Sequence, residues 1–210
     1  RRQRQMCIRD RFIMPLIANA ESEEYDYRGM LLYTINDSKT AITITNSDFY
    51  STAIAIPEKI NGIPVTTIAQ GAFSGRTNLK QVSIPDSVTS IDSSAFEYCK
   101  NISRIVLPKN LQTIGCFAFE GCTNLEYINI PNNVTLIDAY AFSYCSNLSY
   151  ITIPDSVMTV GFGAFDYCTN LKNVSIGKGV KKFGVSPFDD TNVIPDGVFF
   201  NCNNLSLIHI

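Results

Sequence analysis

The residues whose type and spacing could do chemistry are first of all the cysteines. Four stand 23 residues apart and a fifth follows after an insertion, which gives the series Cys99, Cys122, Cys145, Cys168 and Cys202. Such a series could bind a metal ion, but no Cys-x-x-Cys pair occurs, and sulfurs in a line do not surround a point as zinc ligands do. Disulfides within the series would require parallel side chains to bend towards each other. We therefore expect buried free thiols that pack as small hydrophobic groups, with Cys116 outside the series and more exposed.

The sequence offers no nucleophile together with a base. A catalytic Ser or Cys needs a base within hydrogen-bond reach, most often a histidine, and the only histidine is His209. The adjacent carboxylates Asp189 and Asp190 are typical of a solvated loop rather than of an acid and base pair. We expect no catalytic residue, no metal ion and no cofactor, and hence a protein that is not an enzyme.

The remaining candidates lie on the surface of a repeated segment, Leu-x-x-Ile-x-Ile-Pro. In a strand, the residues that flank the middle aliphatic position point outwards, because side chains alternate between two faces. This predicts one outward row of Gln81, Arg104, Tyr127, Tyr150 and Asn173 and a second of Ser83, Val106, Asn129, Thr152 and Ser175. Rigid aromatic and Arg side chains favour binding, and the alternative is that the tyrosines only stabilise the sheet. The predicted partner-binding residues are Arg104, Tyr127, Tyr150 and Asn173.

These positions recur because the chain is built on a 23-residue repeat. Asn recurs at that step from Asn78 to Asn170, Pro from Pro85 to Pro154, and Ala-Phe through Phe73, Phe96, Phe119, Phe142 and Phe165. A fixed period of 20 to 29 residues with regular aliphatic positions is typical of a solenoid of leucine-rich repeats. No unit can bury its own apolar face, so the units must stack.

Each unit combines four local signals. The Leu-x-x-Ile-x-Ile segment predicts a short strand that the following proline ends. A second apolar pair, such as Val88 and Ile91, turns the chain inward again. Ala-Phe is expected to fill the far side of the core in a short helical or 3₁₀ turn. The Asn side chain is expected to point inward and bond backbone amides. A second tyrosine set, Tyr98, Tyr144 and Tyr167, is expected to pack on the convex side.

The consensus Leu-x-x-Ile-x-Ile-Pro-x-x-Val-x-x-Ile-x-x-x-Ala-Phe-x-x-Cys-x-Asn resembles the BspA-type leucine-rich repeat, over roughly residues 54–204. The resemblance implies a repeat solenoid, a β-rich right-handed superhelix of short parallel strands and short helical or 3₁₀ turns. It also implies a surface or secreted protein of the kind found in anaerobic bacteria and some parasitic protists, with adhesion to host matrix or other microbes as its role.

Both termini carry segments that we interpret separately. Residues 1–11 and 205–210 resemble the translated two ends of a transposon-derived sequencing adapter, and we interpret them as scars. The tail also fits the repeat's own strand pattern. Residues 12–20 end in Ala-Asn-Ala and are typical of a signal-peptide remnant, with a buried strand or helix as the alternative. Residues 21–53 predict an N-terminal β cap, with a β-hairpin that turns at residues 36–39, and residues 54–204 predict the solenoid.

Composition narrows the function. The formal net charge is −2, and without residues 1–11 the chain holds 12 basic and 18 acidic side chains, which disfavours nucleic-acid binding. The sequence contains no run of about 20 apolar residues, so we predict no membrane span. We expect a monomeric, secreted or cell-surface protein that binds a protein or glycan on a host or microbial surface. The alternatives are the targeting module of a larger secreted enzyme and a structural spacer.

Overall fold

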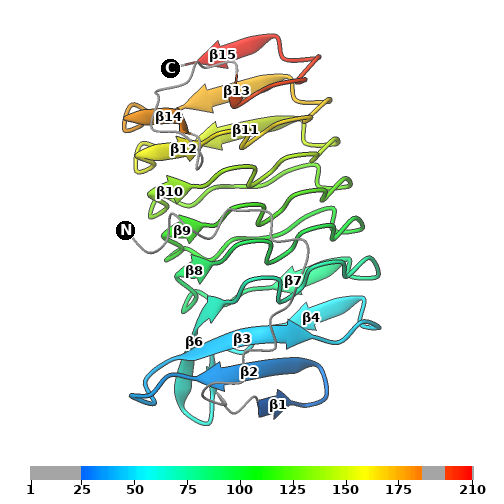
Figure 1. The fold of residues 1–210 in the computed structure, drawn as a ribbon, viewed down its shortest axis with the longest axis vertical. Helices are drawn as coiled ribbons and strands as arrows, with labels where there is room; N and C mark the ends of the chain where they lie inside the picture. The colour runs from blue at the N-terminus through cyan, green and yellow to red at the C-terminus, as the bar shows by residue number, and fades with distance from the viewer. Residues whose placement is uncertain (1–24, 186–196, 210) are drawn as a thin grey trace.

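The computed structural model describes residues 25–185 and 197–209, which form a stack of coils along one long axis (Figure 1). Each coil has three sides, two that carry strands and one made of turns. The strands are β1 (Tyr25–Tyr27), β2 (Leu31–Ile35), β3 (Ile42–Ser47), β4 (Ala53–Ala55), β5 (Lys59–Ile60), β6 (Ile63–Ile68), β7 (Gln81–Ser83), β8 (Ser90–Ile91), β9 (Thr113–Ile114), β10 (Leu136–Ile137), β11 (Tyr150–Ile153), β12 (Thr159–Gly161), β13 (Asn173–Ile176), β14 (Lys182–Val185) and β15 (Leu207–His209). The solenoid expected from the repeat is therefore confirmed.

The longest sheet runs along one side of the solenoid in the order β1-β2-β3-β6-β8-β9-β10-β12-β14, and its strands from β3 onward are parallel. Its central strands β8, β9 and β10 each end at the second residue of the second apolar pair, such as Ile91, which we expected only to turn the chain. They pair in register, as Ile91 does with Ile114 and Ile114 with Ile137. Because successive coils have equal length, two residues per coil suffice to continue the sheet.

The second strand-bearing side, which we call the short-strand face, holds the predicted Leu-x-x-Ile-x-Ile segments. It contains the pair β4-β7 and the sheet β11-β13-β15. Between them, the coils at residues 103–106 and 126–129 carry isolated bridges in place of strands, from Ser83 to Val106 and from Arg104 to Tyr127, and the Glu126 N–H donates to Ser103 O. The predicted strands thus exist at both ends of this side, and the centre keeps the register with fewer hydrogen bonds.

On the third side, which we call the turn stack, the chain forms a series of turns in place of the expected helical or 3₁₀ turns. Along it, alternate N–H groups donate within the coil and to the next coil: Glu97 N–H bonds Ser94 O, whereas Phe96 and Tyr98 N–H bond Ala118 O and Glu120 O at 2.7 Å. The donors to the next coil include residues with positive φ, such as Tyr98 at 56°. A helix would direct every N–H along its own segment and leave the neighbouring coils unbonded. The expectation of helical turns was wrong for this reason.

A ladder of phenylalanine rings fills the core. Phe73, Phe96, Phe119, Phe142 and Phe165 are fully buried, and successive rings stack with centroids 4.8 to 5.4 Å apart. Phe199 continues the ladder at 5.5 Å from Phe165. Phe188, which keeps the 23-residue step, lies outside the described residues, and so does the predicted loop at 186–195. The described chain resumes at Gly197. The ladder therefore runs through the length of the solenoid.

The five cysteines of the series are free and buried, as expected, and each thiol also makes a hydrogen bond. The Cys145 Sγ–H donates to Phe119 O in the coil before it at 3.2 Å, and Cys122 and Cys168 make the equivalent bonds. Burial raises the pKa of the Cys99 thiol to about 12 and that of Cys202 to about 11. Cys116, expected to be more exposed, is also fully buried, where it packs against Ala139.

The asparagines of the repeat do not point inward. They are exposed, and their amide groups donate to the preceding coil instead of accepting from backbone N–H groups. Asn101 Nδ2 donates to Thr77 O at 2.6 Å, and Asn124 Nδ2 donates to Asn101 Oδ1 at 3.3 Å. The expected inward orientation was wrong because the backbone N–H groups of these turns already donate to backbone carbonyls, as the Ile102 N–H does to Cys99 O and the Leu125 N–H to Cys122 O.

The N-terminal end is closed by the predicted hairpin. Strands β2 and β3 are antiparallel, and the turn is held by Asn36 Oδ1, which accepts from the N–H groups of Thr40 and Ala41. Arg76, which occupies the cysteine position of the first coil, ties this hairpin to the solenoid. Its guanidinium donates to Ser47 O at 2.7 Å and lies 3.6 Å from the ring of Phe49.

We predict that Phe142→Ala lowers the free energy of unfolding by about 3 to 5 kcal/mol, because it removes two ring contacts and leaves a cavity in the ladder. Urea denaturation followed by circular dichroism measures this change. Phe142→Leu retains most of the volume and should cost less. A loss below about 1 kcal/mol for the alanine variant would contradict a core that depends on the ladder.

We predict that the thiols of Cys122, Cys145 and Cys168 resist alkylation in the native protein, because burial raises the pKa of each well above its ordinary value. Iodoacetamide at pH 8 followed by peptide mass spectrometry measures the labelling. In urea all three should react fully. Labelling of the native protein at the rate of an exposed cysteine would show that the coils open freely.

Candidate functional site

The short-strand face brings the four predicted partner-binding residues into one row. Arg104 pairs with Tyr127 across an isolated bridge, and Tyr150 pairs with Asn173 in the sheet β11-β13. The rings of Tyr127 and Tyr150 join the two halves at a centroid distance of 5.0 Å. The predicted geometry is confirmed, and the predicted binding role of these residues stays a prediction.

Exposure in this row differs from residue to residue. Tyr150 exposes 45% of its surface, Arg104 and Asn173 are exposed, and Tyr127 is half-buried. Each is fixed from below by an inward aliphatic neighbour such as Ile151, which is buried because side chains alternate along β11. The tyrosine planes are tilted by 33°. The row therefore offers a rigid aromatic surface flanked by a guanidinium and an amide.

The second outward row borders a polar groove that the sequence did not predict. The groove has a volume of about 660 Å³, and its polar lining residues include Asn132, Thr152, Asp155, Ser175 and Lys178. Asp155 Oδ1 accepts from the Lys178 N–H at 2.8 Å, which fixes one edge. In sequence, Asn132 and Asp155 each follow the proline of their unit, and Asn and Asp at such a position are typical of turns. Their turn role is real, and no sequence signal marked the groove beside it.

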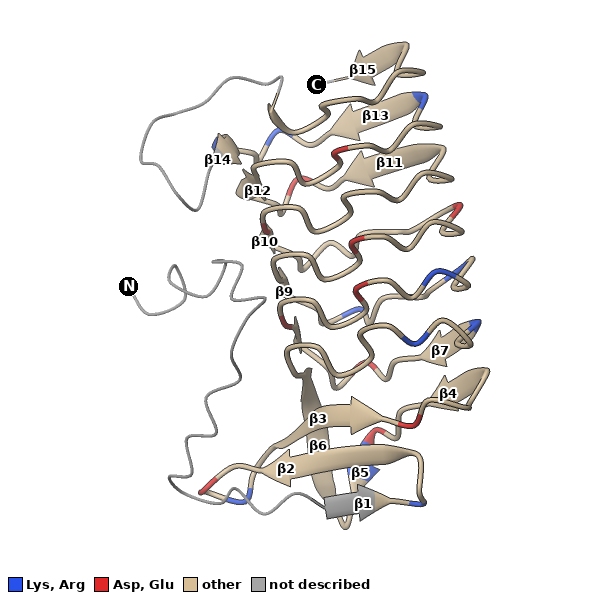
Figure 2. Ribbon diagram, turned by 45° about the vertical axis from the view of Figure 1, so that its right-hand side comes forward, with Lys and Arg blue, Asp and Glu red and all other residues tan. Residues whose placement is uncertain are grey.

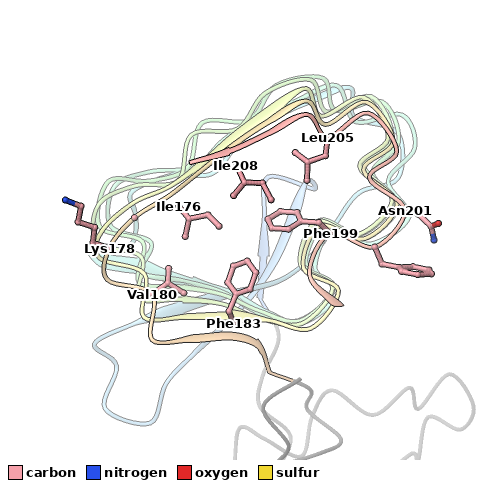
Figure 3. A pocket seen from close by; sticks show the side chains of 10 residues that line it. Ile176, Lys178, Val180, Phe183, Phe199, Asn201, Leu205 and Ile208 are labelled. Atoms are coloured by element: carbon pink, nitrogen blue, oxygen red, sulfur yellow. The ribbon is translucent and has the colours of Figure 1, made fainter. Parts of the chain in front are cut away.

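The last described coil holds a larger and mainly apolar cavity of about 760 Å³. Figure 3 shows Ile176, Val180, Phe183, Phe199, Leu205 and Ile208 directed into the centre of the coil, with Lys178 and Asn201 directed away at two corners. These side chains continue the columns that form the core in earlier coils. The cavity is thus the end of the core, and it contains no convergent polar groups for catalysis.

Among residues 25–185 and 197–209, no group of three or more His, Cys, Asp or Glu side chains is arranged to hold a metal ion. Within the same residues, no helix is long and apolar enough to span a membrane. Figure 2 shows Lys, Arg, Asp and Glu spread thinly over the coils, with no continuous stripe of one sign in the described part of the chain.

Comparison with known proteins agrees with the repeat. The chain is similar to the leucine-rich-repeat protein of T. pallidum, with 32% identity and a TM-score of 0.77 over 88% of this chain and 81% of that one. It is also similar to a leucine-rich cell surface protein of Faecalibacterium prausnitzii, with 30% identity and a TM-score of 0.70 over 88% of this chain. It covers 54% of that second protein, about half its length. No curated protein matches the chain.

A third solved structure shares the fold at lower identity. The pneumococcal vaccine antigen PcpA has a TM-score of 0.57 and 23% identity over 78% of this chain and 52% of its own. Residues 66–194 match six copies of the BspA type leucine rich repeat region. The repeat, the stacked coils and these relatives agree, and the chain belongs to the BspA-type leucine-rich-repeat family.

Proposed function

We propose that this protein is an exported, cell-surface binding protein that holds a protein or glycan partner through the short-strand face, and that it acts in adhesion rather than in catalysis. The observation that carries this proposal is the row of Arg104, Tyr127, Tyr150 and Asn173. Its aromatic pair is partly exposed, although the fold buries the phenylalanine rings from Phe73 to Phe165 completely. Aromatic and Arg side chains held on a rigid surface are the residues that most often dominate binding energy.

Further support comes from the relatives and from charge. The F. prausnitzii relative is a cell surface protein, and we extend that location to this chain as part of the proposal. The outward rows carry few charges and many hydroxyl and amide groups, such as Asn129, Thr152 and Ser175, which suit a neutral polar partner. The thin spread of charge in the described residues gives a nucleic acid no basic track.

The rigidity of the row is also relevant to affinity. Binding surfaces that are ordered before contact lose less side-chain freedom on association. Here Tyr127 and Tyr150 limit each other through their ring contact, and the inward residues beneath them are buried. A partner that lies along the solenoid axis would contact several coils at once without any rearrangement of this face.

We predict that the double variant Tyr127→Ala, Tyr150→Ala weakens attachment to host or microbial surfaces at least about tenfold, because it removes both aromatic anchors. The Tm should stay within about 4 °C of the wild type, since loss of one exposed aromatic pair costs about 1 kcal/mol. Flow cytometry with fluorescently labelled protein measures attachment.

The matched control is Met158→Ala, which removes a side chain that is 47% exposed outside the row. It should attach like the wild type. Unchanged attachment of the tyrosine variant would contradict the assignment of this row as the binding surface. Equal loss in both variants would indicate non-specific adhesion through exposed apolar groups.

A further inference from the structure

The polar groove at the edge of the short-strand face lies where one five-residue motif occurs for the second time. Ile-Pro-Asp-Ser-Val stands at residues 84–88 and again at residues 153–157, and in both places a lysine follows the aspartate by 23 residues, as Lys109 and Lys178. Each aspartate Oδ1 accepts from the backbone N–H of that lysine, at 2.9 Å and 2.8 Å. The two copies therefore share one backbone frame and can be compared group by group.

The first copy of the motif satisfies its own polar groups. The Lys109 ammonium lies 3.5 Å from Asp86 Oδ2. The Ser87 hydroxyl donates to Glu58 O in the coil before it at 3.3 Å. The charged and hydroxyl groups of this copy are thus paired within the protein.

The second copy leaves the equivalent groups open. Lys178 forms no ion pair with Asp155 or with any other described residue, and Asp155 Oδ2 accepts no hydrogen bond within the described part of the chain. The Ser156 Oγ atom is buried and has no hydrogen-bond partner among the same residues. A buried hydroxyl without a partner costs free energy. A pocket on which a few polar groups converge is the usual form of a ligand site.

Two glycines hold this part of the groove in place. Gly177 stands where earlier units have proline, and Gly179 stands where they have Ser or Asn. A Cβ atom at Gly179 would collide with Asp155 O, and one at Gly177 would lie 2.5 Å from Pro154 C. The segment 177–179 therefore packs directly on the backbone of the coil before it. The Asp155 carboxylate is held in a rigid frame as a result.

The remaining polar side chains of the groove can both donate and accept. Asn132 carries an amide, and Thr152 and Ser175 carry hydroxyls. All three are exposed, and their side chains make no hydrogen bond to other described residues. Together with an acceptor-only carboxylate and a donor-only ammonium, they match the hydroxyls of a sugar ring, each of which donates one bond and accepts others. The volume of about 660 Å³ lies in the range of small-molecule sites.

An exposed aromatic ring lies beside the groove on the same strand. Tyr150 and Thr152 both point outward from β11, about 7 Å apart along the strand. Tyr150 exposes 45% of its surface. The C–H face of a sugar ring is apolar and packs on aromatic rings, while the hydroxyls at its rim remain free for hydrogen bonds. A chain of sugar rings that runs along β11 would contact both the ring and the groove.

We propose that the polar groove binds one sugar ring of a glycan, through hydrogen bonds to Asp155 Oδ2, the Lys178 ammonium and the Asn132 amide, and that a neighbouring sugar ring packs on Tyr150. This inference rests on the proposed function, because it names a glycan as the partner that the short-strand face holds. A peptide offers one N–H and one C=O per residue and suits the open edge of a sheet better than a cluster of side-chain groups. A peptide ligand is therefore the alternative that the test must exclude.

The test titrates the purified chain with the methyl glycosides of cellobiose, lactose, maltose and mannobiose and follows its backbone amides by NMR. We expect at least one disaccharide to cause saturable shifts at Thr152, Ser175 and Lys178. Asp155→Asn keeps an oxygen for the Lys178 N–H but removes the charged acceptor, so it should weaken binding at least about tenfold.

The matched control is Asp86→Asn, which makes the same change in the copy of the motif that is already paired. It should bind the disaccharide like the wild type. The absence of a saturable shift with every disaccharide would overturn the proposal. Equal weakening by Asp86→Asn and Asp155→Asn, or equal binding of the hydroxyl-rich peptide acetyl-Ser-Thr-Ser-amide, would also overturn it.

Attachment to cells separates this inference from the function on which it rests. Mild periodate treatment of the target cells cleaves the vicinal diols of sugars and should lower attachment, as should Asp155→Asn. If the Tyr127→Ala, Tyr150→Ala variant loses attachment while periodate and Asp155→Asn have no effect, the face binds a protein and only the glycan assignment fails. If the tyrosine variant attaches like the wild type, the adhesive role fails, and the disaccharide titration alone decides whether the groove binds sugar.

Discussion

The structure depends on the burial of each coil by its neighbours. A single coil has strands of two to six residues and cannot enclose a core, so its apolar side chains become buried only when other coils lie above and below. The phenylalanine ladder is the clearest expression of this constraint, because each ring finds its contact in the adjacent coil and none within its own. The cysteine thiols follow the same rule, since each donates to a carbonyl one coil away.

Stacking in register also decides what the surface can do. Residues that are 23 positions apart in sequence fall into columns. A column whose side chains do not pack in the core can vary in residue type from coil to coil. Ser143, Asp166 and Phe200 succeed one another in one such column on the turn stack. The short-strand face shows the same freedom, with Arg104, Tyr127, Tyr150 and Asn173 in sequence. The core columns, in contrast, keep one residue type through most coils. The row proposed to bind a partner lies in a column that varies.

Much of this architecture could be predicted from the sequence because the repeat reports directly on burial. The phenylalanine and cysteine series, the hairpin and the outward row at Tyr127 and Tyr150 all follow from period and alternation. The hydrogen bonds between coils could not be predicted, since they depend on backbone direction. Ser90 and Ile91 form part of the longest sheet although two residues give no strand signal.

On the turn stack, the sequence contains a signal for left-handed backbone that the sequence analysis did not use. Gly75, Tyr98, Gly121 and Tyr144 alternate at one repeat position, and glycine at a recurring position indicates a left-handed backbone. Tyrosine at the same position then signals strain that the fold does not require. Tyr98, Tyr144 and Tyr167 were expected to pack on the convex side. Tyr144 and Tyr167 stack on each other with ring centroids 4.4 Å apart, and Tyr144 still exposes 47% of its surface.

The most direct test of the account is amide hydrogen exchange of the native protein, measured residue by residue by NMR. The account predicts strong protection for Phe96, Tyr98, Phe119 and Tyr144, whose N–H groups bond the next coil across the turn stack. Their protection should match that of the long sheet at Ile91 and Ile114, since both report the same stacking. Exchange at the rate of open surface turns would contradict the claim that the coils are bonded to one another on all three sides.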